Sequence, residues 1–411
     1  MSSTPLWLDD APAPRAPLVR DLDTRVCIVG AGVTGLATAW HLVQRGIRAT
    51  LVDGRTVAGG ASGRNGGFVT AGPAPAYHEA VQRWGRASAQ RIQAATVDAR
   101  EQVLRLAAEI GADAALRRSG SLRVALDEVE AADVRAELAA LLADGFAASG
   151  VGEADLPAAL RGPGRHGMFV PDDVLMHPAR WYRALAAQLE REGVAIFEHT
   201  PVSAPLGERD GRALVLRAPG ARIRAEVVVA AADGALASLV PAAAAGVRCR
   251  RLHAIASAPV ERQVLPCGVG WRSGYEYCQQ LPDGRIVLGG FSDLDGAASY
   301  TDHELASQPV HERIERELRF RLGVLEPVTH RWVGLVGYGP DERPRVGPVE
   351  SEPGLFAAGG YNGSGNLNGW VAGRILAELI ADGVSQDADL YGHAGYDPIP
   401  RTEGVTRSAA G

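Results

Sequence analysis

The chain has 411 residues, of which 46% are hydrophobic and 22% are charged, and its net charge is -6. These values are ordinary for a globular protein and leave room for two domains or one composite domain. The acidic balance, without basic blocks, argues against nucleic acid or a membrane surface as the main partner. No apolar run approaches the roughly 18 residues that span a bilayer. The acidic start is unlike a signal peptide and the four cysteines form no C-x-x-C pair, so we expect a cytoplasmic location.

Residues 1–20 form a proline-rich arm in which Trp7 is a candidate anchor. The first regular elements predicted after the arm are a buried strand at 26–29, a helix at 36–45 and a second strand at 49–52. Strand, helix and strand in this order are typical of the start of a parallel, doubly wound sheet.

The turn between the first strand and the helix carries glycines at G-x-G-x-x-G spacing. Gly30 permits the tight turn, Gly32 lets the backbone approach a pyrophosphate, and Gly35 lets helix and strand pack closely. The start of the helix offers free N–H groups and a positive dipole end to that anion. Asp53, directly after the second strand, is placed to accept both ribose hydroxyls and disfavours a 2′-phosphate. The pattern predicts a site for FAD or NAD and not for NADP.

Later elements follow from hydrophobic periodicity and from the positions of Gly and Pro. Gly and Pro cluster over 144–173 and indicate a boundary. Pro178 is predicted to occupy the first turn of a helix that ends before Gly193. The remaining predictions, in chain order, are helical periodicity over 76–115, a strand at 122–126, a helix at 128–143, strands at 194–197 and 225–231, alternating strands over 247–326 with a helix near 309–322, a strand at 355–360 and a helix at 367–382.

Two glycine-rich loops favour a flavin over a nicotinamide. Residues 59–68, G-G-A-S-G-R-N-G-G-F, place backbone N–H groups and the side chains of Arg64 and Asn65 after the second strand. Residues 359–367, G-G-Y-N-G-S-G-N-L, run into the last helix. The start of that helix, aimed at the N1 and C2 carbonyl edge of an isoalloxazine, would stabilise the charge of the reduced ring. Both loops must meet one ring for this prediction to hold.

Taken together, these motifs resemble those of a known family, the D-amino acid oxidase and sarcosine oxidase superfamily of FAD-dependent oxidoreductases. The nearest branch is that of gamma-glutamylputrescine oxidoreductase. The resemblance covers roughly residues 5–392. It rests on W-L-D at 7–9, G-A-G-V-T-G-L at 30–36, A-S-G-R-N-G-G at 61–67, H-P at 177–178, L-P-D-G-R-I-V-L-G-G at 281–290, R-W-V-G at 331–334 and P-D-E-R-P-R-V-G at 340–347.

The resemblance implies an α/β (α+β composite) fold with a discontinuous, Rossmann-like FAD-binding domain of the glutathione-reductase type. A second domain with an antiparallel sheet would bind substrate. We expect the N-terminal arm at 1–20, the FAD-binding domain at 21–75, 160–245 and 327–395, the substrate-binding domain at 76–159 and 246–326, and a disordered tail at 396–411.

The resemblance also implies a set of cofactor contacts. Val202 would meet the adenine through its backbone, and Ala230 and Ala231 would flank the nucleotide half. The substrate would be covered by strands near Tyr275, Tyr277 and Leu288. The full set of expected FAD contacts is Gly30, Gly32, Val33, Thr34, Gly35, Asp53, Gly54, Arg55, Ala61, Ser62, Arg64, Asn65, Gly66, Gly67, Val202, Ala231, Gly363, Ser364, Gly365, Asn366 and Leu367.

Departures from the family pattern narrow the chemistry. The segment 332–341 lacks the cysteine, and 59–67 lacks the histidine, through which relatives attach flavin, so we expect non-covalent FAD. The chain has no lysine, and the position matching the oxygen-activating lysine of sarcosine oxidases falls near Val287. The carboxylate-binding arginine of amino acid oxidases would fall near Leu281. An amine is therefore favoured over a simple α-amino acid, although Arg64 or Arg272 remains available for a carboxylate.

The expected reaction is hydride transfer from the α C–H of a neutral amine to flavin N5, which leaves an imine for water to hydrolyse. The flavin would be reoxidised by O2 or by an electron carrier. We expect Glu276 to point to solvent, His177 to mark a helix start, and Asp341 and Arg345 to fix a loop. The candidate catalytic residues are Arg64, Tyr275, Tyr277 and His253.

Two alternatives belong to other classes. An NAD-dependent dehydrogenase would use the opening motif alone. A non-catalytic, flavin-bearing subunit would leave substrate binding to a partner.

Overall fold

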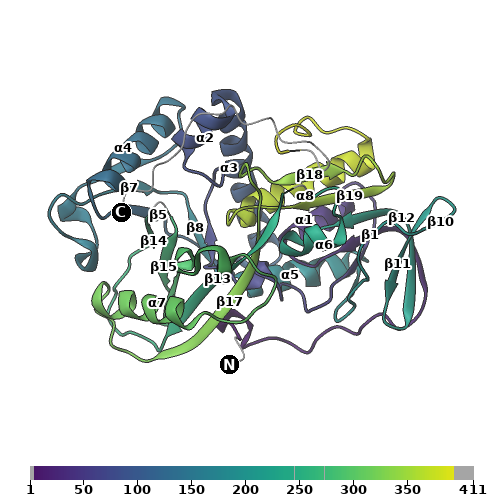
Figure 1. Ribbon diagram of the computed structural model, residues 1–411, viewed down its shortest axis with the longest axis horizontal. Coiled ribbons are helices and arrows are strands. Elements are labelled where there is room, and N and C mark those ends of the chain that lie inside the picture. Colours follow the sequence, from purple (N-terminus) through teal and green to yellow (C-terminus); the bar gives the residue numbers. More distant parts are fainter. Residues whose placement is uncertain (1–3, 245, 273, 393–411) are drawn as a thin grey trace.

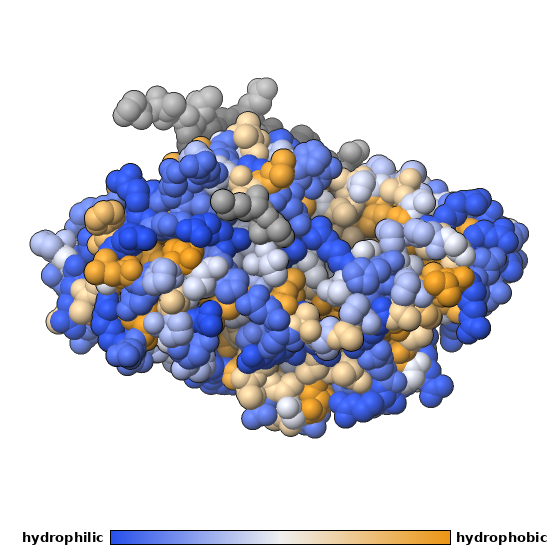
Figure 2. Space-filling view, turned by 90° about the horizontal axis from the view of Figure 1, so that it is seen from below, coloured by the Kyte–Doolittle hydropathy of each residue, from blue (hydrophilic) through white to orange (hydrophobic). Residues whose placement is uncertain are grey.

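The computed structural model describes residues 4–244, 246–272 and 274–392. Two large mixed sheets dominate it, one toward the right and one toward the left of Figure 1. The face seen in Figure 2 is mostly polar, with scattered hydrophobic patches. No helix in the described ranges is long and apolar enough to cross a membrane. The predicted tail at 396–411 lies outside the described residues.

The first sheet contains the predicted nucleotide-binding strands. Its parallel centre pairs β9 with β2, β2 with β1, β1 with β12, and β12 with β19. Antiparallel strands extend it at β11 and β18. The strands are β1 (Leu22–Val29), β2 (Thr50–Val52), β9 (Ala195–Phe197), β10 (Arg209–Asp210), β11 (Ala213–Ala218), β12 (Ala221–Ala230), β18 (Arg345–Pro348) and β19 (Leu355–Gly359).

Helices α1 (Val33–Val43) and α8 (Gly365–Asp382) pack side by side against this sheet (Figure 1). Gly369 and Gly373 of α8 permit the close approach, because a Cβ on Gly373 would stand 2.5 Å from the Cβ of Ala37. The other helices are α2 (Tyr77–Trp84), α3 (Arg86–Glu109), α4 (Glu128–Ala143), α5 (Pro178–Arg191), α6 (Leu236–Leu239) and α7 (Gln308–Phe320). The tight α1–α8 contact brings the starts of the two predicted cofactor helices together.

Helix α1 begins earlier than predicted. The sequence placed its first residue at Leu36, after the third glycine of the motif, whereas the structure begins it at Val33 with Gly32 as the N-cap. Gly35 therefore lies inside the first turn, where a Cβ would stand only 1.9 Å from the carbonyl oxygen of Gly30. The predicted helical segment at 76–115 is divided into α2 and α3 by Gly85, which has a φ of 82°.

The second sheet has the order β17-β13-β16-β15-β14-β5-β7-β6. Helix α7 packs on β13 and β16, while α4 covers β5 and β7. Figure 1 shows α7 and α4 on the part of the molecule that holds this sheet. Its strands are β5 (Ser121–Ala125), β6 (Ser149–Val151), β7 (His166–Val170), β13 (Arg248–Ser257), β14 (Gly268–Trp271), β15 (Glu276–Gln280), β16 (Ile286–Gly289) and β17 (Val328–Tyr338). A three-stranded sheet joins β3 (Phe68–Val69), β8 (Val174–Met176) and β4 (Leu116–Arg118).

Two strands lie in a different sheet from the one that the predicted division implied. β7 and β17 fall within segments assigned to the nucleotide-binding part, yet β7 pairs with β5 and β17 pairs with β13 over nearly its full length. The apolar residues of β7 and β17 are compatible with either sheet. Only pairing with strands that are distant in the sequence decides which sheet each of them joins.

Candidate cofactor site and active site

The opening turn is built by glycines that no larger residue can replace. Gly30 has a φ of 110°, and its N–H donates to the carbonyl of Val52 at 2.9 Å. A Cβ on Gly30 would lie 2.4 Å from the carbonyl oxygen of Ala231. The turn therefore locks the ends of β1, β2 and β12 together, as the spacing predicts.

Asp53, the predicted ribose contact, lies directly after β2 and beside the opening turn. Its Oδ2 accepts the N–H of Ala31 and its Oδ1 accepts the N–H of Arg55, both at 2.7 Å. Burial raises the pKa of this carboxyl, and the two N–H groups oppose that rise. Because a carboxylate has about four acceptor positions, these bonds leave capacity for ribose hydroxyls.

The loop at 59–67 is fixed by its own side chains. Ser62 Oγ accepts the N–H of Val33, in the first turn of α1, at 2.9 Å. Asn65 Oδ1 accepts the N–H of Gly67 at 2.8 Å, and its amide donates to the carbonyl of Ser62. Arg64 donates to the carbonyl of Gly59 at 2.9 Å and, across to β17, to that of Val333 at 3.1 Å. The arginine predicted to touch substrate thus ties this loop to the second sheet.

Two buried tryptophans hold the same loop from the other side. The indole N–H of Trp7 donates to the carbonyl of Asn65, and that of Trp332 donates to the carbonyl of Arg64, both at 2.8 Å. Their rings meet edge to face with centroids 6.5 Å apart. Trp7 is the anchor that the sequence indicates in the arm, and it has no exposed surface.

The two glycine-rich loops meet. Asn65 and Asn366 exchange side-chain contacts at 3.4 Å, and Asn366 donates to the carbonyl of Phe68 at 2.6 Å. The hydroxyls of Thr34 and Tyr361 lie 2.7 Å apart and join the opening motif to the second loop. Segments separated by about three hundred residues therefore form one surface.

Sequence reasoning missed Asp233, which organises the second loop. Its Oδ1 accepts the N–H of Gly360 and its Oδ2 accepts the N–H of Gly337, both at 2.9 Å. Burial raises the pKa of this carboxyl, and the backbone donors oppose the rise. The signal in the sequence was A-A-D-G after the buried strand, with the aspartate at a φ of 40°.

Helix α8 begins without a side-chain cap. Ser364 precedes it but forms no capping bond, and Gly363 takes a φ of 93°. The first N–H groups of a helix have no partner within the helix and favour a negatively charged or carbonyl oxygen. Together with Asp53 and the first turn of α1, this start supplies the donor and acceptor set that FAD requires, so the residues fit the cofactor. The residues of this start are Gly365, Asn366 and Leu367.

One face of the second sheet is turned toward the loops. Tyr277 packs so closely on Gly66 that a Cβ there would lie 2.3 Å from the ring, and Gln279 donates to the carbonyl of Gly66 at 2.6 Å. Tyr338 reaches the second loop, where its hydroxyl would lie 3.5 Å from a Cβ on Gly363. We call this side of the sheet the site face.

Tyr275 and Tyr277 approach the same neighbour, Tyr338. Burial raises the pKa of Tyr338 to about 12; Arg250 opposes this rise, and Tyr275 and Tyr300 add to it. Burial also raises the pKa of Tyr277, with a smaller contribution from Tyr338. Tyr275 is 56% exposed and marks the solvent side of this group.

Glu276 does not point to solvent as predicted. It has no exposed surface, and its carboxylate accepts the N–H of Phe291 at 3.2 Å and pairs with Arg272 at 3.2 Å. Burial is the largest cause that raises its pKa, to about 7. The prediction failed because both faces of β15 are covered: the side opposite Tyr277 packs into the core beneath α7.

His253 and Leu288 lie on the face opposite the loops. His253 accepts the N–H of Ser307 at 3.0 Å, its ring meets that of His311 on α7, and burial lowers its pKa to about 3. Leu288 belongs to the core beneath α7. Strand alternation places both side chains away from the site face. Arg272 is likewise engaged, by Glu276 and Asp293.

The remaining expected residues fall as follows. The backbone N–H of Ala231 donates to the carbonyl of Val29 at 2.8 Å, and Val202 follows β9 with a partly buried side chain. His177 accepts the N–H of Arg180 and caps α5, which confirms its expected place at a helix start. Asp341 pairs with Arg345 at 3.1 Å, as expected of loop-fixing residues.

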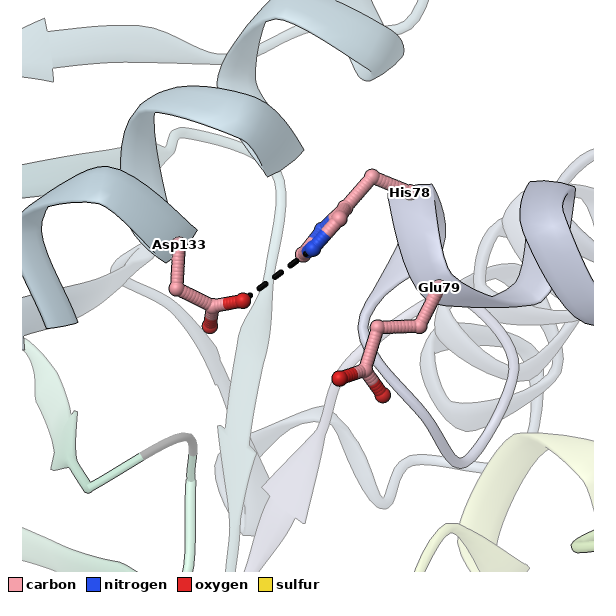
Figure 3. Close-up of side chains that lie close together, drawn as sticks. All are labelled: His78, Glu79 and Asp133. Carbon is pink, nitrogen blue, oxygen red and sulfur yellow. Dashed lines mark ion pairs between the residues drawn. The ribbon is translucent and has the colours of Figure 1, made fainter. Parts of the chain in front are cut away.

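Three potential metal ligands meet outside this site. His78 and Glu79 of α2 face Asp133 of α4, and the imidazole lies 3.1 Å from the Asp133 carboxylate (Figure 3). Asp133 also pairs with Arg123, and Glu79 pairs with Arg83. Because these guanidinium groups compete with a cation, we interpret the cluster as an ion-pair network between two helices.

Comparison with known proteins identifies the family. A family model described as "DAO: FAD dependent oxidoreductase" matches residues 25–379. The chain belongs to this family. It is 29% identical over 391 residues to the probable oxidoreductase OrdL of Rhizobium meliloti (strain 1021), covering 93% of this chain and 88% of the relative. Gamma-glutamylputrescine oxidoreductase of Escherichia coli (strain K12) is 24% identical, with 97% and 93% covered.

The fold agrees with solved structures. The crystal structure of glycine oxidase from Geobacillus kaustophilus matches with a TM-score of 0.76 at 20% identity, covering 89% of this chain and 96% of that one. The protein is thus an FAD-dependent oxidoreductase with a mixed α/β fold, and the resemblance read from its motifs is confirmed.

Proposed function

We propose that this FAD-dependent oxidoreductase oxidises the C–N bond of an amine or an amino acid-like compound. The contact between the loops at 59–67 and 359–367 carries the proposal, because it allows one isoalloxazine to meet both. The names of two relatives, gamma-glutamylputrescine oxidoreductase and glycine oxidase, contain nitrogen compounds and support the same class of substrate.

When bound, the flavin supplies the acceptor for a hydride and stores the two electrons. The chain supplies binding and orientation. We infer that the uncapped start of α8 stabilises negative charge at the pyrimidine edge, and that Asp53 and the first turn of α1 hold the ribose and pyrophosphate. The site face, with Tyr277 and Tyr338, would cover the opposite side of the substrate. Trp7, Val287 and Trp332, all without exposed surface, would keep water from the ring.

No side-chain base is required. A neutral amine pushes its lone pair into a C=N bond as the α C–H leaves as hydride, and water then converts the imine to a carbonyl compound and a free amine. Arg64 is placed to position the loop, since its guanidinium donates to two backbone carbonyls. Its side chain is 12% exposed and also lies 3.8 Å from Glu304.

We propose that FAD is held without a covalent bond. Neither 59–67 nor 332–341 contains a cysteine, and 59–67 contains no histidine. Acid precipitation checks this: the yellow colour is expected in the supernatant, and colour retained by the pellet would contradict it.

Anaerobic mixing with a panel of amines tests the function. We expect the purified yellow protein to lose its flavin absorption in the visible range with at least one amine. A protein that carries FAD but keeps its colour with every amine would favour a flavin-bearing subunit, and a colourless protein that binds NAD would favour a nicotinamide dehydrogenase. Hydrogen peroxide formed in air separates O2 from an electron carrier as the final acceptor.

A further inference from the structure

The hydroxyl of Ser364 is turned away from the helix that it precedes. A serine at the N-cap normally accepts an N–H of the first helical turn. Ser364 is the N-cap residue of α8 and forms no such bond. Its Oγ donates to the carbonyl of Tyr361 at 2.9 Å and accepts the side-chain amide of Asn368 at 3.1 Å. The first N–H groups of α8 are therefore not capped by this hydroxyl.

Asn368, in the first turn of α8, holds Ser364 through its side-chain amide. The Nδ2 of Asn368 also donates to the backbone carbonyl of Ser364 at 3.1 Å and to that of Gly72 at 3.0 Å. A reversed amide would turn Oδ1 toward these two carbonyl oxygens, which cannot donate. The network therefore selects the orientation in which Nδ2 points to Ser364.

Tyr391 fixes the other end of this amide. Its hydroxyl donates to Oδ1 of Asn368 at 2.7 Å, and both side chains are buried. Burial raises the pKa of the Tyr391 hydroxyl well above its ordinary value, so the hydroxyl keeps the proton that it donates. The next residue, Gly392, forms a backbone bridge with Arg345 and accepts the N–H of Val346 at 2.9 Å. Tyr391 is thereby fixed beside β18.

Charged pairs hold the segment between α8 and Tyr391. Asp387 pairs with Arg374 of α8 at 2.5 Å and with Arg91 of α3 at 3.2 Å. Asp389 pairs with Arg91 at 2.9 Å. The chain beyond α8 is thus folded back along the helix, so that a residue from its far side reaches the first turn.

We propose that Asn368 and Tyr391 are positioning residues that keep the Ser364 hydroxyl from capping α8, so that the first N–H groups of this helix remain open to the flavin. The proposal rests on the placement of the α8 start at the pyrimidine edge, made under the proposed function. Without the amide of Asn368, the hydroxyl is released to accept an N–H of the first turn and competes with the flavin carbonyl. The effect is larger for the reduced flavin, because a charged acceptor gains more from the same donors.

The test measures the reduction potential of the bound flavin and the affinity of the apoprotein for FAD. Equilibration with a reference dye and a chemical reductant gives the potential without any substrate. Y77F is the matched control, because Tyr77 is as buried as Tyr391 and its hydroxyl donates to Asp144 at the end of α4. The variants are N368L, Y391F, S364A, S364A/N368L and S364D.

N368L should lower the affinity for reduced flavin relative to oxidised flavin about threefold to tenfold. At about 30 mV per tenfold for two electrons, the potential falls by about 15–30 mV. Y391F should shift it less in the same direction, because the amide keeps its Nδ2 donors and loses only the group that fixes its orientation. Y77F should lose stability and keep the potential of wild type.

Removal of the hydroxyl distinguishes positioning from simple loss of packing. The potential of S364A/N368L should recover to that of S364A, because no hydroxyl is left to cap the helix. Potentials that do not fall in N368L and Y391F, or that are equal in N368L and S364A/N368L, would overturn the proposal. If N368L does not fold, Y391F and S364A/Y391F give the same comparison.

S364D separates this inference from the assignments on which it rests. A carboxylate at the N-cap of α8 should lower the potential wherever the helix start meets the ring. A fall in S364D with none in N368L and Y391F sinks this inference alone, whereas no fall in S364D sinks the placement of α8 as well. Failure of every amine to bleach the wild-type flavin contradicts the proposed substrate class and leaves these potentials unaffected.

Discussion

Replacing Trp332 with phenylalanine should loosen the loop at 59–67 and weaken FAD binding. The indole N–H of Trp332 donates to the carbonyl of Arg64 at 2.8 Å, and the ring has no exposed surface. Phenylalanine leaves this carbonyl without its donor, which costs about 1–3 kcal/mol. The smaller ring also leaves a cavity that costs about 1 kcal/mol. The free energy of unfolding should therefore fall by about 2–4 kcal/mol.

The matched control is W370F. Trp370 is also buried, but its indole donates at 3.4 Å to the side chain of Gln102, which is only partly buried. This variant should lose about 1–2 kcal/mol of stability, from the cavity and the longer bond.

Of these two variants only W332F should change the affinity for FAD, because Trp332 donates to the loop at 59–67 and Trp370 donates to Gln102. If ordering the loop on binding costs the roughly 1–3 kcal/mol lost with the indole bond, Kd rises about fivefold to 160-fold. Urea unfolding of the apoprotein and titration of apoprotein with FAD, followed by flavin fluorescence, give the two quantities. Equal Kd values for W332F and W370F would refute the role of the indole in holding the loop.

Three further predictions follow from buried groups. D233N should lose about 1–3 kcal/mol of unfolding free energy and bind FAD more weakly, since one carboxylate oxygen that accepts a backbone N–H becomes a donor; unchanged urea and FAD titrations would contradict this. G373A should lose about 1–3 kcal/mol, because the new Cβ meets Ala37, whereas G60A, whose Cβ meets nothing within 4 Å, should leave apoprotein stability unchanged. Glu276 has its pKa raised in the folded state, to about 7, so the unfolded chain loses its proton first as the pH rises. The stability of wild type relative to E276Q should therefore fall by about 3 kcal/mol as the pH rises from about 4 to about 8, and stay constant above. Urea curves that show no such fall would contradict the raised pKa of this buried carboxyl.

The elements with strong local signals could be predicted from sequence. The opening turn is an example, because Gly30 and Gly35 occupy positions where any side chain would collide with backbone. Pro178 and His177 likewise set the start of α5 by local geometry. Such signals depend on neighbours a few residues away, so they can be recognised without knowledge of the fold.

Residues whose role depends on distant partners could not be predicted in the same way. Glu276 was expected in solvent because alternation along one strand says nothing of a second covering layer, which α7 provides. His253 was a candidate for the active site until pairing of β13 with β17 showed which face it occupies. Asp233 gave only a turn signal, since its three backbone donors come from segments more than a hundred residues away.

The sequence by itself determined the nucleotide-binding start, the two glycine-rich loops and the family. Each of these is written in a short run of residues whose backbone geometry or chemistry is local. The tertiary structure alone decided that Asn65 meets Asn366, and that Tyr391 meets Asn368. Those contacts arise from the α1–α8 packing and from strand pairing, which join segments that no local pattern connects.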